Sequence, residues 1–290
     1  MLRTIKFILN HPFTKGHKLQ AILGFVKWQI TSRITKRPAV YQFTKNSKLW
    51  VWKGLTGATG NIYCGLHEFE DMAFLLHFLR PGDWFTDVGA NIGSYTILAS
   101  GEAGANSIAV EPVPATFSNL QHNINLNELA IKVKALNIGL GSKKDILRFT
   151  KGHDTGNHVA NDNDTDIIEV PIDTLDNIMT DNAPILIKID VEGFETEVLN
   201  GAKKTLASAK LKAIIIELNG AGRRYGFEDA KIHTMLLDHG FKPMRYLPFK
   251  RRLETGSLNT EHNTLYIRDL AFVEKRLITA KTVYIKHRPL

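Results

Sequence analysis

The fold is decided by the stretch Trp84-Phe85-Thr86-Asp87-Val88-Gly89-Ala90-Asn91-Ile92-Gly93-Ser94-Tyr95. An apolar run typical of a buried strand meets an acid, and two glycines separated by three residues lead into a helical segment. A second apolar run, 107–110, ends at Glu111. This order is typical of half of a nucleoside-binding site: a strand, a glycine turn, a helix, and a second strand that ends in an acid. The turn lets a ligand approach the backbone, and the second acid can hold ribose hydroxyls.

The spacing of the turn argues against a dinucleotide ligand. The dinucleotide fingerprint needs a middle glycine that lets pyrophosphate approach, and here that glycine is missing between Gly89 and Gly93. A carboxylate at Asp87 would repel pyrophosphate but suits the amino group of a methionine moiety. The pattern around Gly89, Asn91 and Gly93 resembles motif I of S-adenosylmethionine-dependent methyltransferases, and Glu111 resembles their ribose-binding acid. The alternative is a tight strand-to-helix turn that holds no ligand.

A second motif sharpens this resemblance. The string Lys188-Ile189-Asp190-Val191-Glu192-Gly193-Phe194-Glu195 follows an upstream Thr174-Leu175-Asp176. Together with Asp-Val-Gly-Ala-Asn-x-Gly, it resembles the FkbM family of methyltransferases over about residues 60 to 270. That resemblance implies methyl transfer from S-adenosylmethionine to hydroxyl oxygens of sugars and natural products. Within it, Tyr95 is expected at the edge of the donor pocket, and Asn137 resembles the position that closes over adenine.

Strand-like and helix-like segments alternate, which predicts a Rossmann-like α/β fold of the class I methyltransferase type. We expect a mostly parallel twisted sheet with helices on both faces and an antiparallel last strand. The expected order is strand 84–89, helix 93–102, strand 106–111, helix 114–127, strand 131–137, strand 184–190, helix 194–207, strand 211–217, helix 228–239 and a closing antiparallel pair at 241–248 and 263–268. Residues 144–172 interrupt the alternation with two strands and a polar loop, a candidate substrate-side flap.

Length and composition indicate one sizeable α/β core: 290 residues, 43% of them hydrophobic. We expect a basic N-terminal helical segment at 1–55, the methyltransferase domain at 56–272 and a basic tail at 273–290. The single cysteine, Cys64, excludes an intramolecular disulfide and a cysteine-based zinc cluster, and is expected to be packed inside.

The net charge of +8 favours an anionic partner or surface. No apolar run is long enough to span a membrane and no cleavable signal is evident, so we expect a cytoplasmic protein. The segment 1–55 either covers the active site as a lid or contacts a membrane surface peripherally through an amphipathic helix. The basic turn at Lys250-Arg251-Arg252 either holds a phosphate of the acceptor or is a solvated hairpin tip.

Methyl transfer to a hydroxyl needs a group that removes the hydroxyl proton, or a metal. Asp190, Glu192 and Glu217 are the candidate catalytic acids, because alternation along an extended backbone would put Asp190 and Glu192 on one side. Asp190, Glu217 and Asn219 are the candidate oxygen ligands of a divalent ion. Alternatively, Asp190 caps the following helix, which then begins at Glu195.

Three histidines, His67, His153 and His158, are weaker candidates for the base. Lys188 is expected to pair with an acid. The sequence therefore predicts an O-methyltransferase with a hydroxylated small-molecule or glycan acceptor, in which phosphate groups are one option. It leaves two alternatives open: a nucleic-acid methyltransferase and a non-catalytic scaffold that binds S-adenosylmethionine. Nucleic acid is not the expected partner, because the positive residues are scattered and the segment after 184–190 lacks an Asn/Asp-Pro-Pro-Tyr string. The oligomeric state cannot be read from this sequence.

Overall fold

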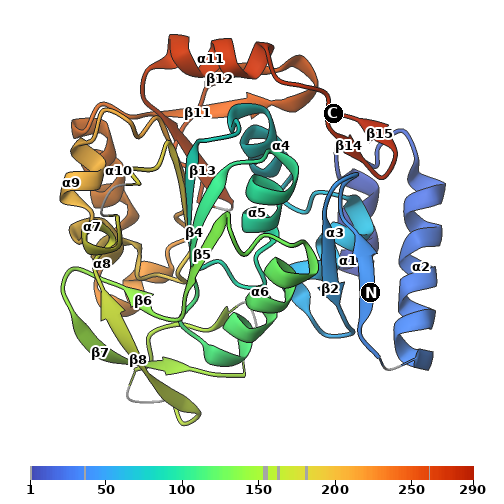
Figure 1. Ribbon diagram of the computed structural model, residues 1–290, viewed down its shortest axis with the longest axis horizontal. Helices are drawn as coiled ribbons and strands as arrows, with labels where there is room; N and C mark the ends of the chain where they lie inside the picture. Colours follow the sequence, from blue (N-terminus) through green and yellow to red (C-terminus); the bar gives the residue numbers. More distant parts are fainter. Residues whose placement is uncertain (1, 36, 153–155, 162–163, 180–181, 261) are drawn as a thin grey trace.

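The computed structural model describes residues 2–35, 37–152, 156–161, 164–179, 182–260 and 262–290. The predicted Rossmann-like fold is confirmed by an eight-stranded sheet flanked by helices (Figure 1). Its strand order is β12-β11-β13-β10-β9-β3-β4-β5. The strands are β3 (Trp84–Val88), β4 (Asn106–Val110), β5 (Val133–Leu136), β9 (Leu186–Ile189), β10 (Ala213–Glu217), β11 (Lys242–Leu247), β12 (Arg252–Thr255) and β13 (Asn263–Ile267).

Five strands, β5, β4, β3, β9 and β10, run parallel, and β13 closes the sheet antiparallel to β10. The expected antiparallel pairing of the last strands is confirmed between β11 and β13. The strand order reverses beside β3, whose neighbours are β4 and the much later β9. In open α/β sheets, a ligand binds at the carboxyl ends of the strands flanking such a reversal.

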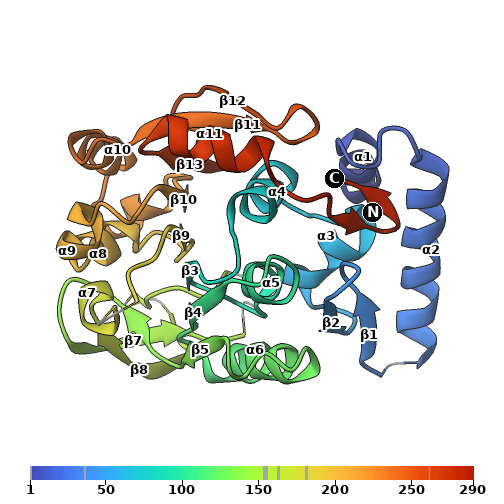
Figure 2. The same cartoon turned by 45° about the horizontal axis from the view of Figure 1, so that its top comes forward.

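Helices cover both faces because strand residues alternate between two apolar cores. Ile215 packs in one core, whereas Ile214 and Ile216 pack in the other. On the Ile215 side lie α4 (Phe69–Phe78), α5 (Ser94–Ile97), the π-helical turn η1 (Leu98–Glu102), α6 (Pro114–Leu126) and α11 (Leu270–Ile278). On the other side lie α7 (Leu175–Ile178), α8 (Glu195–Asn200), α9 (Lys203–Ala207) and α10 (Asp229–Asp238). Figure 2 shows the two helical layers on either side of the sheet.

The helix expected over 194–207 is divided into α8 and α9. The break occurs at Gly201, where an added Cβ would lie 2.1 Å from the carbonyl oxygen of Gly141. The backbone just after β6 (Gly139–Leu140) therefore approaches so closely that only a glycine fits at position 201. The expected strands of the insertion are confirmed as β7 (Asp145–Thr150) and β8 (Ile167–Asp173), which form a small sheet with β6.

The N-terminal segment and the C-terminus pack together at one side of the molecule (Figure 1). The segment comprises α1 (Leu2–Asn10), α2 (Lys18–Thr35), β1 (Ala39–Gln42), β2 (Lys48–Val51) and α3 (Thr56–Cys64). The C-terminal hairpin of β14 (Tyr284–Ile285) and β15 (Arg288–Pro289) contacts it: Lys286 donates to the carbonyl oxygen of Tyr63 at 2.9 Å, and Arg288 donates to that of Phe13 at 3.0 Å. α11 crosses the expected boundary after residue 272.

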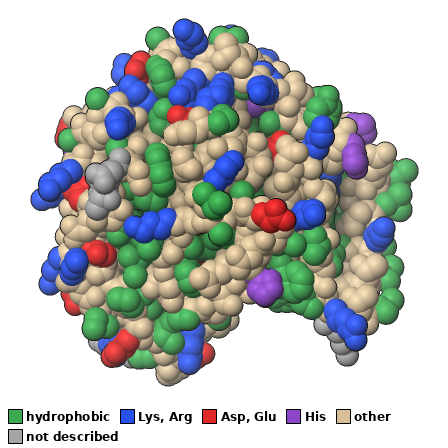
Figure 3. Space-filling model, in the orientation of Figure 1, with side chains coloured by type: hydrophobic (Ala, Val, Ile, Leu, Met, Phe, Trp, Pro, Cys, Tyr) green, Lys and Arg blue, Asp and Glu red, His purple; other side chains and the backbone are tan. Residues whose placement is uncertain are grey.

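The short helices η3 (Ala221–Tyr225) and η4 (Pro248–Lys250) follow β10 and β11 in the chain. Cys64 is buried, as expected. In the part of the chain that the structure describes, no helix combines the length and the apolar character needed to span a membrane. Hydrophobic side chains are visible along the outer edge of α2 in the space-filling view (Figure 3).

Candidate active site

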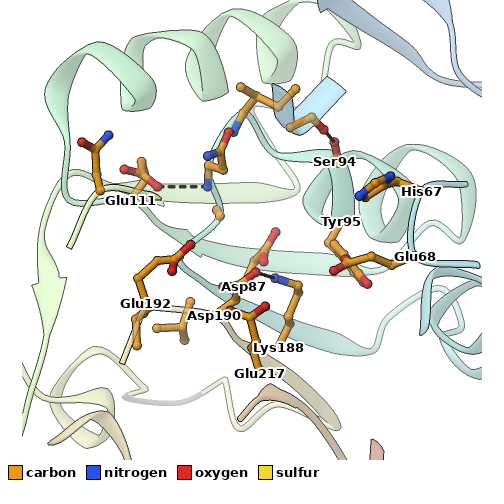
Figure 4. Close-up of a pocket in the computed structure, with 18 of the residues that line it drawn as sticks. His67, Glu68, Asp87, Ser94, Tyr95, Glu111, Lys188, Asp190, Glu192 and Glu217 are labelled. Carbon is orange, nitrogen blue, oxygen red and sulfur yellow. Dashed lines mark hydrogen bonds and ion pairs between the residues drawn. The ribbon is translucent and has the colours of Figure 1, made fainter. Parts of the chain in front are cut away.

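A cavity of about 590 Å³ opens at the carboxyl ends of β3, β4, β9 and β10. Its size is in the range of small-molecule sites. The predicted site residues that line it are Asp87, Gly89, Asn91, Tyr95, Glu111, Asp190, Glu192 and Glu217. Gly93, Asn137 and Asn219 are outside this lining. Figure 4 shows the acids arranged around one space, from four strand ends that are far apart in the sequence.

The two glycines of the turn serve different contacts. Gly89 has a φ of +78°, and an added Cβ would lie 1.8 Å from the carbonyl oxygen of Asp190, so the loop can lie against the end of β9 only without a side chain there. Gly93 has a φ of +88°, and its Cβ would lie 2.5 Å from a side-chain carbon of Leu120 on α6. Gly89 therefore lets the turn lie close to the end of β9 at the cavity, whereas Gly93 lets the start of α5 pack closely against α6.

Asp87 is buried at the end of β3, and one of its carboxylate oxygens is fully engaged. That oxygen, Oδ2, accepts hydrogen bonds from the backbone nitrogen of Thr96 at 3.0 Å and from its hydroxyl at 2.6 Å. Burial raises the pKa of Asp87, while the nearby Lys188 and the Thr96 bonds oppose that rise. Asp87 thus orients α5 and also presents its carboxyl group to the cavity.

Glu111 connects the glycine turn to the next strand. Its Oε2 accepts from the backbone nitrogen of Asn91 at 2.9 Å, and its Oε1 accepts from that of Val113 at 3.0 Å (Figure 4). Burial raises the pKa of Glu111 to about 7. Asn137 lies behind this acid and donates to the carbonyl oxygens of Glu111 and Pro112 at 2.8 and 2.9 Å, so its contact with adenine stays a prediction.

Lys188 is the buried cation of the site. Its Nζ lies 2.7 Å from Oδ2 of Asp190 and 4.9 Å from the centre of the Tyr95 ring, which confirms the expected pairing with an acid. Burial opposes the charge of the ammonium group, but the carboxylates of Asp190, Glu68 and Asp87 outweigh it and raise the pKa of Lys188. The amine is therefore a fixed positive charge and cannot act as a base at neutral pH.

Asp190, Glu192 and Glu217 form a compact acid cluster, with one carboxylate oxygen of each within 4.8 Å of the others. Burial and the neighbouring carboxylate of Asp190 raise the pKa of Glu192 to about 7. Burial and the carboxylates of Asp190 and Glu192 raise that of Glu217 to about 8. Groups with pKa values displaced toward neutrality are suited to proton transfer.

The sequence led us to expect that strand alternation would bring Asp190 and Glu192 to one side. In the structure a turn brings them together instead. β9 ends at Ile189, and Glu192 then adopts a φ of +55°, in the left-handed region. The turn is held by Glu195, whose Oε1 accepts from the backbone nitrogens of Val191 at 3.2 Å and Gly193 at 3.1 Å. Glu195, and not Asp190, therefore satisfies the amides in front of α8.

Asn219 lies apart from the acid cluster. Its side chain is exposed, and its Oδ1 accepts from the backbone nitrogen of Ala221 at 2.9 Å within its own turn. The structure brings Glu192, in place of Asn219, to Asp190 and Glu217.

The structure reveals a second acidic pair, Glu68 and Asp71, that the sequence did not predict. Both acids lie at the start of an apolar helix, where acids are common because they interact favourably with the helix dipole. Instead, the side-chain amide of Asn263 donates to both acids at 3.1 Å. Burial and the carboxylate of Glu68 raise the pKa of Asp71 to about 7. The hydroxyl of Tyr95, which lies next to Glu68 in Figure 4, is buried and has no hydrogen-bond partner in the described part of the chain.

The N-terminal segment forms part of the cavity wall. A cover over the active site was one of the two alternatives that the sequence left open for this segment. Arg3, Thr4 and Phe7 of α1 line the cavity, and the ring of Phe7 lies 5.2 Å from that of His67. The spacing i, i+1, i+4 places these three residues on one side of α1.

Other predicted groups lie elsewhere. His158 is outside the cavity lining, although its neighbour Asn157 belongs to that lining. The Nε2 atom of His158 lies 3.6 Å from Oδ2 of Asp164. His153 lies outside the described residues. The basic turn 250–252 does not line the cavity, and Arg251 donates to the carbonyl oxygen of Ala280.

Comparison with known proteins agrees with this geometry. A family model described as the methyltransferase FkbM domain matches residues 87–243, which is more than half of the chain. The match begins at Asp87 and includes the ends of β3, β4, β9 and β10, so it spans the strands that carry the cavity acids.

Several individual proteins are also similar. Hexuronic acid methyltransferase AglP of Haloferax volcanii is 27% identical over 199 residues, which are 68% of this chain and 77% of the relative. The 31-O-demethyl-FK506 methyltransferase FkbM of Streptomyces tacrolimicus is 27% identical over 212 residues, 60% of this chain and 78% of the relative. A crystal structure of a methyltransferase FkbM from Methylobacillus flagellatus is 19% identical, covers 72% of this chain and 52% of that chain, and has a TM-score of 0.46.

Proposed function

Since this chain belongs to the FkbM family of methyltransferases, we propose that it transfers the methyl group of S-adenosylmethionine to a hydroxyl of a sugar, glycan or related hydroxylated metabolite. The observation that carries the proposal is the acid cluster of Asp190, Glu192 and Glu217, which lies in the same cavity as the glycine turn. The names of two relatives give a hexuronic acid and 31-O-demethyl-FK506 as their substrates, and both names support a hydroxylated acceptor.

The residues present fit the methyl donor. The described lining holds six carboxylates, of Glu68, Asp87, Glu111, Asp190, Glu192 and Glu217, against two formal cations, Arg3 and Lys188. Burial, together with neighbouring acids, raises the pKa values of Glu111 and Glu217, and a cationic ligand would favour the ionised forms of these groups. The unpartnered hydroxyl of Tyr95 offers a further polar contact to a ligand.

We assign the donor to the side of the cavity formed by the glycine turn. Gly89 and Asn91 present backbone there, Asp87 is suited to an amino group, and Glu111 is suited to ribose hydroxyls. Bound S-adenosylmethionine supplies a methyl group already activated by its positively charged sulfur. The remaining wall, from Phe7, His67 and the acid cluster, is then left for the acceptor.

In this assignment Glu217 is the general base. Its carboxylate takes the proton of the acceptor hydroxyl as the new carbon–oxygen bond forms and the carbon–sulfur bond breaks. Burial and the surrounding acids keep Glu217 largely protonated in the empty cavity at neutral pH. A positive charge nearby lowers a carboxyl pKa, so donor binding and activation of the base are coupled. Lys188 holds Asp190 in place and stays charged throughout.

The acid cluster is also the candidate site of a divalent ion. Three carboxylates within 4.8 Å are suitable oxygen ligands, although Asp190 is already compensated by Lys188. Calorimetric titration with Mg²⁺ separates the two roles. Binding that is lost in Glu192→Gln supports a metal-assisted reaction, whereas absence of binding together with metal-independent turnover leaves Glu217 as the base alone.

The proposed reaction is tested with S-adenosylmethionine labelled in its methyl group and a panel of hexuronic acid glycosides, neutral hexosides and RNA. We expect label and the mass of one methyl group in a hydroxylated acceptor, lost in Glu217→Gln and kept in the control Glu254→Gln, which changes a half-buried residue outside the cavity lining. Label in RNA alone would replace the proposal with the nucleic-acid alternative. Tight donor binding without turnover on any acceptor in the panel would favour the scaffold alternative.

A further inference from the structure

The helix α2 is apolar on two opposite sides. Its inner side packs on the protein through Ala21 and Phe25, and the Phe25 ring lies 5.0 Å from that of Tyr63. Its other side carries five apolar residues that are between 43% and 76% exposed: Leu19, Leu23, Val26, Ile30 and Ile34. At about 100° per residue these five fall within about 80° of arc, so they form one continuous stripe. We call this stripe the outer face of α2 (Figure 3).

The outer face of α2 lies in a strongly basic part of the chain. The first 67 residues contain 11 Lys and Arg and no Asp or Glu, so the remaining residues hold 26 cations against 29 acids. The excess positive charge of the protein therefore comes entirely from this segment. Lys15, Lys18, Lys27 and Arg33 are exposed, and none of them forms an ion pair with any residue that the structure describes.

We propose that the outer face of α2 docks on an anionic lipid surface. An unpartnered apolar stripe on a helix that is already packed on its other side requires a cover. Lipid tails can cover the stripe, while acidic headgroups neutralise Lys27 and Arg33, which at about 100° per residue lie about 20° beyond its two edges. This charge pattern disfavours a second copy of the chain, because a symmetric contact would bring two acid-free surfaces together. This inference does not depend on the proposed function.

Docking also concerns the active site. α1 packs against α2, and Arg3, Thr4 and Phe7 of α1 line the cavity. The docked helix is therefore directly attached to one wall of the cavity. An acceptor held at the same lipid surface would approach from this wall.

The test is cosedimentation of the full chain with vesicles of phosphatidylcholine containing phosphatidylglycerol, and with vesicles of phosphatidylcholine alone. We expect binding at least about tenfold stronger to the anionic vesicles, weakened by salt. The double variant Leu23→Glu/Ile30→Glu should weaken it by about tenfold or more. Lys27→Gln/Arg33→Gln should also reduce it by about tenfold. The matched control is Ile131→Glu/Ile278→Glu, which changes two apolar residues exposed elsewhere, at 99% and 68%, and should bind as the unaltered chain does.

Melting temperature and affinity for S-adenosylmethionine, measured on every variant, separate lost docking from lost folding. Docking is overturned if the unaltered chain fails to bind the anionic vesicles, or if Leu23→Glu/Ile30→Glu binds them unchanged. A dimer that this variant dissociates in sedimentation, without vesicle binding, would identify a second copy as the cover. Vesicle binding by a chain that fails to bind S-adenosylmethionine would leave docking intact and reject the proposed function.

Discussion

The ammonium group of Lys188 lies 2.7 Å from Oδ2 of Asp190 at the centre of the candidate active site, and the lysine side chain is only 5% exposed. This pair joins the second motif, on β9, to the glycine turn, because Lys188 is opposite Asp87 in the register of β9 and β3. The carboxylates of Glu68 and Asp87 also contribute to the raised pKa of Lys188. One buried cation thus balances acids from three separate elements.

Removal of the positive charge of Lys188 should lower the free energy of unfolding. Lys188→Met leaves buried carboxylates without their partner, and we expect a loss of about 3 kcal/mol in the free energy of unfolding. The control is Lys212→Met, which breaks a pair of the same 2.7 Å length with the exposed Asp269 and should cost much less, because water screens that pair. Denaturant unfolding at neutral pH measures both, and equal losses would contradict the role given to Lys188.

The glycine turn offers a second matched pair. Gly89→Ala introduces a Cβ 1.8 Å from the carbonyl oxygen of Asp190, so the loop must move away from β9. We expect affinity for S-adenosylmethionine to fall at least about tenfold, since loop and acids no longer face one ligand. Gly82→Ala has a similar φ, +86° against +78°, but open space around the Cβ. It should cost about 1 kcal/mol of stability from backbone strain and leave donor affinity unchanged.

Stability should depend on pH through Glu217. Its pKa is raised from 4.5 to about 8 in the fold, so the folded state keeps a proton that the unfolded state has released. Stability therefore falls as pH rises from about 4.5 to about 8. Between about pH 7 and pH 9, above the value of about 7 to which the other buried acids are raised, Glu217 is the main contributor among these acids, and the fall in this range is about 1 kcal/mol after allowance for solvent around this partly exposed group. Buried His11 and His77 have pKa values lowered to about 4, so they are neutral in both states in most of this range.

Denaturant unfolding at pH values between about 6 and 9 checks this dependence, with Glu217→Gln as the test and Glu254→Gln, outside the cavity lining, as the control. We expect Glu217→Gln to lose less stability with rising pH than the unaltered chain does. Glu254→Gln should show the same pH dependence as the unaltered chain. A Glu217→Gln variant with the full dependence would show that other groups carry it.

The charge of the donor gives a prediction for ligand binding. S-adenosylmethionine is a cation at sulfur, whereas S-adenosylhomocysteine, its demethylated product, is not. Glu192 and Glu217 become anionic as pH rises through about 7 and about 8, and an anionic site favours the cation. The ratio of donor affinity to product affinity should therefore rise about tenfold between about pH 6 and pH 9. The ratio should be nearly flat in Glu192→Gln/Glu217→Gln, and a flat ratio in the unaltered chain would place the sulfur away from these acids.

Much of the site could be predicted because its parts are local in sequence. Apolar runs define β3, β4, β9 and β10, and parallel strands bring their carboxyl ends to one edge. The acids that follow these runs, Asp87, Glu111, Asp190 and Glu217, therefore had to lie near one another. The same reasoning gives the order of layers, because alternation of strand and helix allows few topologies.

The remaining residues could not be predicted because they depend on tertiary contacts. Glu68 resembles a helix-start acid until Asn263, almost two hundred residues away in sequence, is seen to donate to it. Glu192 joins the acid cluster through a left-handed turn that alternation does not anticipate. Arg3 and Phe7 line the cavity only because the N-terminal segment folds back onto His67, between α3 and α4, and no local pattern states where a basic N-terminal helix packs.

The central claim, that the cavity binds a methyl donor through the glycine turn and Glu111, is tested most directly by calorimetric titration with S-adenosylmethionine and S-adenosylhomocysteine. Glu111→Gln places an amide group where two backbone N–H donors, of Asn91 and Val113, now meet a carboxylate. We predict that both ligands bind the unaltered chain and bind at least about tenfold more weakly to this variant at a temperature well below its own melting transition. Unchanged affinity of Glu111→Gln for both ligands, or no binding of either by the unaltered chain, would contradict the account.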